Sequence, residues 1–175
     1  PVINADDDQL VIGKGYDHNF CLNEGDGPAA VAYDPESGRV ILAGNHKYFM
    51  DCITVAASTK RVVHFLGKSE LLEPPLKRYF EPFGVIPVHR ERKDKAALES
   101  AIEVLNDDKV IGIFPEGKVK LKTEEQYTIT PFKFGAVKMA EQTGSRIVPF
   151  SITGDYKIFR KGLKIQFFEP ITVEE

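Results

Sequence analysis

From Arg39 onward, the sequence alternates between short apolar runs and longer segments with helical periodicity. The runs that we predict as strands are residues 40–43, 62–66, 85–88, 110–114, 147–152 and 163–168. The segments that we predict as helices are residues 49–58, 70–81, 94–105, and a fourth whose apolar stripe comprises Phe132, Ala136, Met139 and Ala140 before it ends at Gly144. Because such alternation favours parallel pairing, the pattern predicts an α/β fold, a single domain with a mostly parallel mixed sheet flanked by helices.

A length of 175 residues suits one domain with a sizeable core. Residues 1–38 contain eight acidic residues and one lysine, a net charge of −7, so residues 39–175 carry +4 out of the total of −3. We therefore predict an acidic N-terminal arm of unassigned role over 1–38 and the α/β domain over 39–175. A mildly basic domain suits an anionic substrate or membrane surface, and it is also what a solvated face without a partner looks like.

Nucleic acid is not an expected partner, because the net charge is negative and no platform of aromatic and basic residues is evident. The two cysteines, Cys21 and Cys52, form neither a metal-ligand spacing nor a disulfide framework, so they indicate a reducing, cytoplasmic setting. No apolar run approaches the roughly 18 residues that span a bilayer, and no signal peptide opens the sequence. Any membrane association is therefore expected to be peripheral.

A histidine and an aspartate follow the first predicted strand, in the segment Asn45-His46-x4-Asp51. Residues directly after a strand of an α/β fold lie at the carboxyl end of the sheet, where sites form. If His46 lies on the turn and Asp51 in the following helix, the carboxylate can fix the ring tautomer and leave the other nitrogen as a base. Taken alone, the segment favours a plainer interpretation, a helix-capping Asn-His pair and a surface aspartate.

Two further segments follow predicted strands. Residues 114–117, Phe-Pro-Glu-Gly, end the strand at 110–114, and their turn can aim the Glu116 carboxylate across the end of the sheet. The alternative is an ordinary turn with Glu116 in solvent. Arg90 follows the strand at 85–88, where an arginine can bind a phosphate in a bidentate manner or simply lie in solvent.

Together these segments resemble the motifs of the glycerolipid acyltransferase family, the 1-acylglycerol-3-phosphate O-acyltransferases. The matching residues, in the family's order, are Asn45, His46 and Asp51, then Arg90, then residues 114–117, and then Val148 and Pro149. Residues 131–136 also resemble the family's segment before its late helix, and the resemblance covers about residues 39–172. It implies a glycerol-3-phosphate acyltransferase-like fold and an enzyme of phospholipid biosynthesis.

The resemblance implies transfer of a fatty acyl group from an acyl-CoA or acyl carrier protein (ACP) thioester to 1-acyl-sn-glycerol-3-phosphate (lysophosphatidic acid), giving phosphatidic acid. It assigns catalysis to His46 as general base and Asp51 as its partner, with no metal and no cofactor beyond the thioester. The residues that it assigns to substrate binding are Asn45, Arg90, Glu116, Gly117, Lys118 and Lys133. Its partners are the acyl donor, with ACP where that protein carries the acyl group, and the inner face of a membrane, on which we expect a peripheral, cytoplasmic protein.

The chain departs from the family after residue 117, where Lys118 and Val119 stand in place of threonine and, usually, arginine. Phosphate contacts can then fall to Lys118, Lys120 or Lys133. The alternatives are an acyltransferase for another lysophospholipid or for glycerol-3-phosphate, a lipid-binding relative without catalysis and, at lower weight, a thioester hydrolase. Residues 71–83 carry aromatic and basic side chains that fit either an interfacial or a core-facing helix, and the exposure of the aromatics distinguishes the two.

Overall fold

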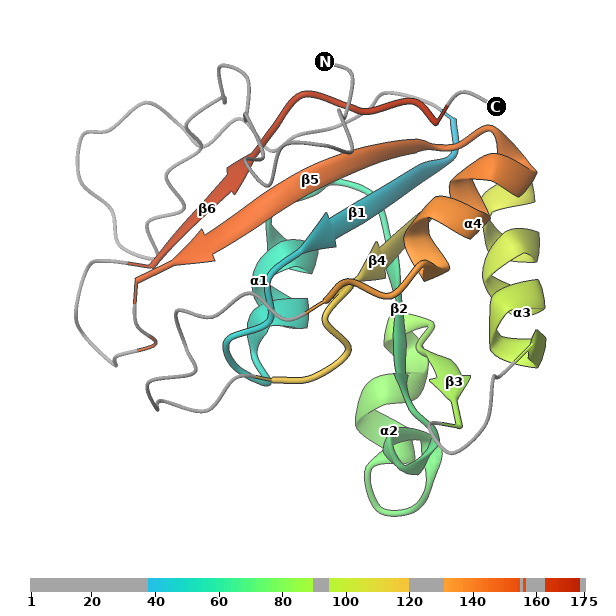
Figure 1. The fold of residues 1–175 in the computed structure, drawn as a ribbon. Coiled ribbons are helices and arrows are strands. Elements are labelled where there is room, and N and C mark those ends of the chain that lie inside the picture. The colour runs from blue at the N-terminus through green and yellow to red at the C-terminus, as the bar shows by residue number, and fades with distance from the viewer. Residues whose placement is uncertain (1–37, 90–94, 120–130, 155, 157–162, 174–175) are drawn as a thin grey trace.

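The structure, a computed structural model, describes residues 38–89, 95–119, 131–154, 156 and 163–173. The predicted acidic arm, apart from its last residue, lies outside these ranges, as do Arg90 and Lys120. Within them the chain forms a six-stranded sheet with helices on both faces (Figure 1). No helix in the described ranges is long and apolar enough to cross a membrane.

The strands lie in the order β3-β2-β4-β1-β5-β6. Their bounds are Val40–Gly44 for β1, Val63–Lys68 for β2, Ile86–Val88 for β3, Val110–Ile113 for β4, Arg146–Thr153 for β5 and Lys164–Phe167 for β6. All neighbours pair in parallel except β5 and β6, which are antiparallel. The predicted α/β fold with a mostly parallel sheet is confirmed.

The helices divide between the two faces of the sheet. Their bounds are Asp51–Ala57 for α1, Lys77–Phe80 for α2, Lys95–Asn106 for α3 and Gly135–Thr143 for α4, with short 3₁₀ helices at Ser69–Leu72 (η1) and Glu81–Phe83 (η2). Because side chains alternate along a strand, Val40 and Leu42 pack with Val55 of α1, while Ile41 packs on the opposite face with the helices α3 and α4. Each strand of the centre is thus apolar on both sides.

Two predicted helices need correction. The helix predicted over 70–81 is wrong as a continuous element, because Pro74 and Pro75 interrupt it and leave η1, α2 and η2 instead. Phe132 does not belong to the apolar stripe of the last helix, since α4 begins at Gly135 and Phe132 is exposed. The remaining stripe, Ala136, Met139 and Ala140, is buried as predicted.

Two strands contain a proline. Pro87 lies in β3, which is an edge strand, as its missing N–H predicts. Pro149 lies in β5 just before Phe150, which is the first residue of β5 to pair with β6. Its carbonyl still accepts a hydrogen bond from the amide of Phe168 at 2.9 Å. The carbonyl of Pro149 therefore keeps a backbone contact with the chain just after β6, although the proline has no N–H to donate.

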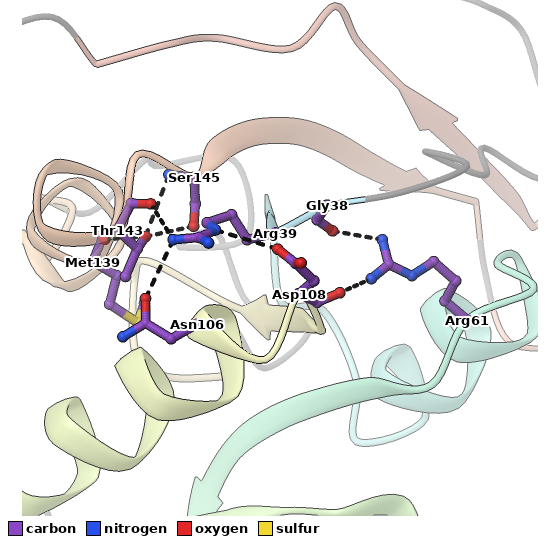
Figure 2. A network of polar contacts seen from close by, with 8 residues as sticks. All are labelled: Gly38, Arg39, Arg61, Asn106, Asp108, Met139, Thr143 and Ser145. Atoms are coloured by element: carbon purple, nitrogen blue, oxygen red, sulfur yellow. Dashed lines mark hydrogen bonds and ion pairs between the residues drawn. The ribbon is translucent and has the colours of Figure 1, made fainter.

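Polar contacts join the starts of the parallel strands (Figure 2). Arg39, just before β1, contacts the Asp108 carboxylate at 3.4 Å and donates to the Thr143 carbonyl at 2.9 Å. Arg61, which precedes β2, donates to the carbonyls of Gly38 and Asp108. These contacts connect the segments just before β1, β2, β4 and β5. The polar side chains at this end of the sheet therefore stabilise the fold. The opposite, carboxyl end remains for a site.

Gly112 of β4 allows the Phe65 ring to lie across the sheet. It pairs directly with Phe65 of β2, and a Cβ on Gly112 would lie 2.3 Å from the ring. Phe65 is buried and stacks on Phe114, so the ring has little room to move. We predict that Gly112→Ala lowers the free energy of unfolding by about 1–3 kcal/mol, the usual cost of overpacking.

Gly135→Ala is the matched control, because the added Cβ would meet Ile113 at an ordinary 3.6 Å at the start of α4. We expect that variant to be neutral or to gain up to about 1 kcal/mol from helix propensity. Urea denaturation of both variants measures the difference. Equal stability of the two would contradict the packing that we describe around Gly112.

Candidate active site

The carboxyl ends of β1 and β4 bring the His46–Asp51 motif next to the Phe-Pro-Glu-Gly motif. His46 follows β1, and its ring stacks on Phe114, which follows β4, with centroids 4.0 Å apart and planes 12° apart. Phe114 in turn stacks on Phe65 and forms a T-shaped contact with Phe150. The imidazole therefore lies against a wall of aromatic rings that continues into the core.

His46 and Asp51 are in direct contact. The Nδ1 atom of His46 lies 2.8 Å from Oδ2 of Asp51, and Asp51 is fully buried (0% exposed). Helix α1 begins at Asp51, slightly later than predicted, so His46 lies on the turn before it and the contact becomes possible. Since a carboxylate only accepts hydrogen bonds, Nδ1 carries the proton and Nε2 is left as a base. Nε2 has no hydrogen-bond partner among the described residues.

Backbone amides complete the surroundings of the same carboxylate oxygen. The amides of Lys47 and Tyr48 donate to Oδ2 of Asp51 at 2.6 and 2.7 Å. A carboxylate at the first turn of a helix also gains from the positive end of the helix dipole. The turn that presents His46 is therefore wrapped around Asp51.

Tyr156 completes the contacts of Asp51, and sequence reasoning missed it. Its hydroxyl donates to Oδ1 of Asp51 at 2.6 Å and lies 2.9 Å from Oγ1 of Thr54. Burial, followed by the hydrogen bond to the Asp51 carboxylate, raises the pKa of Tyr156 well above its usual value of 10. The phenol therefore stays a donor throughout the physiological range. Tyr156 belongs to none of the motifs, and 105 positions separate it from Asp51, so no local signal indicated it.

Asn45 joins the site to β5. Its side-chain amide donates to the Ile152 carbonyl at 2.9 Å, and its side-chain carbonyl accepts from the Ile152 amide at 2.7 Å. This pair of bonds continues the β1–β5 ladder by one more step beyond Gly44 and fixes the direction of the turn. A contact between Asn45 and a substrate stays a prediction.

The Phe-Pro-Glu-Gly turn lies beside Lys133. Glu116 is buried, and Gly117 adopts a positive φ of 68° that glycine accommodates without strain. The Lys133 amide donates to the Pro115 carbonyl at 2.9 Å, and a Cβ on Gly117 would lie 2.8 Å from Nζ of Lys133. Lys133 and Lys118 are both exposed. The structure thus joins four of the predicted binding residues in one region, while Arg90 lies outside the described ranges.

Cys52, next to Asp51 in the helix, is a free thiol. Burial, followed by the negative charge of Asp51, raises its pKa from 9.0 to about 12. Cys52 is therefore uncharged at neutral pH, and an uncharged thiol is a poor nucleophile. Among the described residues, no group of three or more His, Cys, Asp or Glu side chains could hold a metal ion.

The raised pKa of Cys52 predicts a dependence of stability on pH. Folding favours the neutral thiol, so its contribution is complete below the unfolded value of 9.0 and is lost as the pH rises toward 12. Between pH ~8 and ~10.5, the wild type should lose up to about 2 kcal/mol more unfolding free energy than Cys52→Ala. Denaturation of both proteins at the two pH values tests this, and parallel losses would contradict it.

Known proteins match most of the chain. A 1-acyl-sn-glycerol-3-phosphate acyltransferase of Bacillus subtilis is 27% identical over 143 residues, which cover 78% of this chain and 69% of that protein. A protein of the same name from Borreliella burgdorferi is 33% identical over 132 residues, covering 74% of this chain and 51% of the relative. The crystal structure of the 1-acyl-sn-glycerophosphate (LPA) acyltransferase from Thermotoga maritima shares the fold, with a TM-score of 0.56 and 22% identity over 77% of this chain and 56% of that one.

The chain thus spans about half the length of the Borreliella burgdorferi and Thermotoga maritima proteins and about two thirds of the Bacillus subtilis protein. The Acyltransferase family model matches residues 31–153, more than half of the chain. This range includes the His46–Asp51 pair and the Phe-Pro-Glu-Gly turn, and it confirms the resemblance that the motifs indicated. The chain belongs to the Acyltransferase family.

Proposed function

We propose that this protein transfers a fatty acyl group from an acyl-CoA or acyl-ACP thioester to the free hydroxyl of 1-acyl-sn-glycerol-3-phosphate, forming phosphatidic acid. The observation that carries the proposal is the 2.8 Å contact between His46 and the buried Asp51 at the carboxyl end of β1. The names of the relatives from Bacillus subtilis and Borreliella burgdorferi support this acceptor.

In the proposed reaction, Nε2 of His46 takes the proton of the acceptor hydroxyl while the hydroxyl oxygen attacks the thioester carbonyl. The tetrahedral intermediate collapses, the C–S bond breaks, and the leaving thiolate takes the proton from the imidazolium. The products are an ester and a free thiol, and no acyl-enzyme forms. General base catalysis of this kind is typically worth about 10² to 10⁴ in rate.

Asp51 stabilises the imidazolium that forms in this step. Its Oδ2 lies 2.8 Å from Nδ1, so a positive charge on the ring would be paired at once in a site without solvent around the carboxylate. The Nδ1–H to Oδ2 bond also fixes the tautomer that leaves Nε2 unprotonated. The pair therefore serves both the resting base and its charged form.

Basic side chains near the Phe-Pro-Glu-Gly turn would bind the phosphate of the acceptor. Lys133 lies against Gly117, and Lys118 follows it directly; both are exposed and so can reach an anion. The two lysines would replace the arginine that the family usually has after this turn, and Arg90 would bind the phosphate with them. Glu116, buried in the same turn, would orient the glycerol or the cationic side chains.

The acceptor resides in a bilayer, and we propose that the enzyme docks on an anionic membrane, on its inner face in the cell, through the segment around α2. Leu76, Tyr79 and Phe83 expose much of their apolar surface there, while Lys77 and Arg78 are exposed beside them. This exposure favours the interfacial interpretation of residues 71–83 over the core-facing one. Aromatic side chains next to cations suit the boundary of an anionic bilayer.

The base is tested by thiol release from acyl-CoA and from acyl-ACP, each with and without 1-acyl-sn-glycerol-3-phosphate in lipid vesicles. We predict acceptor-dependent release with at least one donor, and a loss of at least about 10²-fold in His46→Ala. His64→Ala is the matched control, since His64 lies on the other face of β2 from Val63 and Phe65 and contacts the Gly84 carbonyl. Circular dichroism checks that both variants are folded.

Release that does not depend on this acceptor would refute the proposed substrate. The same assay with other lysophospholipids and with glycerol-3-phosphate then distinguishes a different acceptor from thioester hydrolysis or from a protein without turnover.

The membrane proposal is tested by co-sedimentation with vesicles that contain phosphatidylglycerol. The double variant Tyr79→Ser and Phe83→Ser removes side chains that are 63% and 49% exposed, and we expect its partition coefficient to fall by about tenfold or more. The control is Val62→Ser, which removes a side chain that is 65% exposed just before β2. Equal binding of the two variants would mean that α2 does not face the bilayer.

A further inference from the structure

The carboxylate of Asp51 is held at both oxygens, and the two oxygens are held differently. Oδ2 accepts from Nδ1 of His46 and from the amides of Lys47 and Tyr48. Within the described part of the chain, Oδ1 accepts from the Tyr156 hydroxyl, at 2.6 Å. The orientation of the carboxylate plane therefore depends on a side chain that lies outside the family motifs and beyond the matched range of 31–153.

Tyr156 is itself fixed by two neighbours. Its single hydroxyl proton points to Asp51, because a carboxylate can only accept, so the contact at 2.9 Å from the Thr54 hydroxyl is one in which Thr54 is the donor. The same Thr54 hydroxyl also lies 3.3 Å from the Met50 carbonyl, the longer of its two contacts. The rings of Tyr156 and Tyr48 stack, with centroids 5.3 Å apart. These contacts hold the phenol oxygen in place.

The chain after β5 contacts the turn that carries His46 at three points. Nζ of Lys47 donates to the Gly154 carbonyl at 2.7 Å, the Tyr48 ring stacks on Tyr156, and Tyr156 donates to Asp51. All three lie at the carboxyl end of β5, next to the Asn45 contacts with Ile152. The end of β5, together with Gly154 and Tyr156, thus supports one side of the His46 turn.

We propose that Tyr156 is a positioning residue for the acyl transfer, an inference that rests on the proposed function of His46 and Asp51. By holding Oδ1, Tyr156 prevents rotation of the Asp51 carboxylate and keeps Oδ2 directed at Nδ1 of His46. The imidazole then keeps the Nδ1–H tautomer, with Nε2 free to accept the proton of the acceptor. Tyr156 does not itself touch the reacting atoms.

The test is Tyr156→Phe, which removes the hydroxyl and keeps the ring that stacks on Tyr48. We expect kcat for acyl transfer to fall by about tenfold, the effect of one lost hydrogen bond to a charged group, with KM for both substrates unchanged. We expect KM to stay the same because the phenol contacts Asp51 and Thr54 and not Lys118 or Lys133, which are proposed to bind the phosphate.

A matched control is Thr143→Val, which removes a buried hydroxyl at the opposite end of the sheet (Figure 2). Its hydroxyl donates to the Met139 carbonyl at 2.7 Å, so its loss should lower stability without lowering kcat. Denaturation of both variants separates a general loss of stability from a specific loss of turnover. A kcat for Tyr156→Phe no lower than that of the control overturns the proposal.

A second measurement needs no substrate. Nitrogen-15 NMR of the His46 ring in the free protein reports which ring nitrogen carries the proton. We expect the Nδ1–H tautomer to predominate in the wild type and the Nε2–H tautomer to rise severalfold in Tyr156→Phe, while Thr143→Val matches the wild type. An unchanged tautomer ratio in Tyr156→Phe overturns the positioning role even if the wild type transfers acyl groups, and a changed ratio supports it even if the proposed acceptor is wrong.

Discussion

The charge of Asp51, buried without solvent exposure at the start of α1, is the constraint on which the rest of the site depends. An unpaired charge in such a position costs several kcal/mol, so the surrounding chain must supply donors. They come from the turn at 46–48 and from Tyr156, two segments that are far apart in the sequence. The same carboxylate therefore determines the path of the turn, the orientation of the base and the position of Tyr156.

The contacts that stabilise the parallel sheet and the residues of the candidate site lie at opposite ends of the sheet. At the start of the strands, Arg39 and Arg61 bind backbone carbonyls and Asp108, and they fix the strands relative to one another (Figure 2). At the carboxyl end, the turns that follow β1 and β4 carry the side chains of the candidate site, His46 and Glu116 among them. Packing connects the core to the carboxyl end, because the Phe65 ring lies over Gly112, Phe114 stacks on Phe65, and His46 stacks on Phe114. Core packing thus reaches the base directly.

The arginine that the family usually has after residue 117 is absent, but another basic side chain lies at the same turn. Lys133 reaches this turn from the segment before α4, and Gly117 leaves room for it because it has no side chain. A cation can therefore reach the turn from a different part of the chain. The exposed aromatics around α2 likewise belong to a segment that two prolines break into short helices, so it cannot bury an apolar face as a longer helix would.

The sequence by itself determined the order and type of most elements and the pair of His46 and Asp51, because helical stripes, apolar runs and motif spacing are local properties. Pro87 also predicted either an edge strand or a strand end, and β3 is an edge strand. The sequence did not determine the sheet order, the antiparallel β6, the exposure of Phe132 or the role of Tyr156. Tyr156 meets Asp51 across 105 positions, and only packing of the sheet brings them within 2.6 Å. Tertiary structure decided these features because each depends on contacts between segments that no local pattern records.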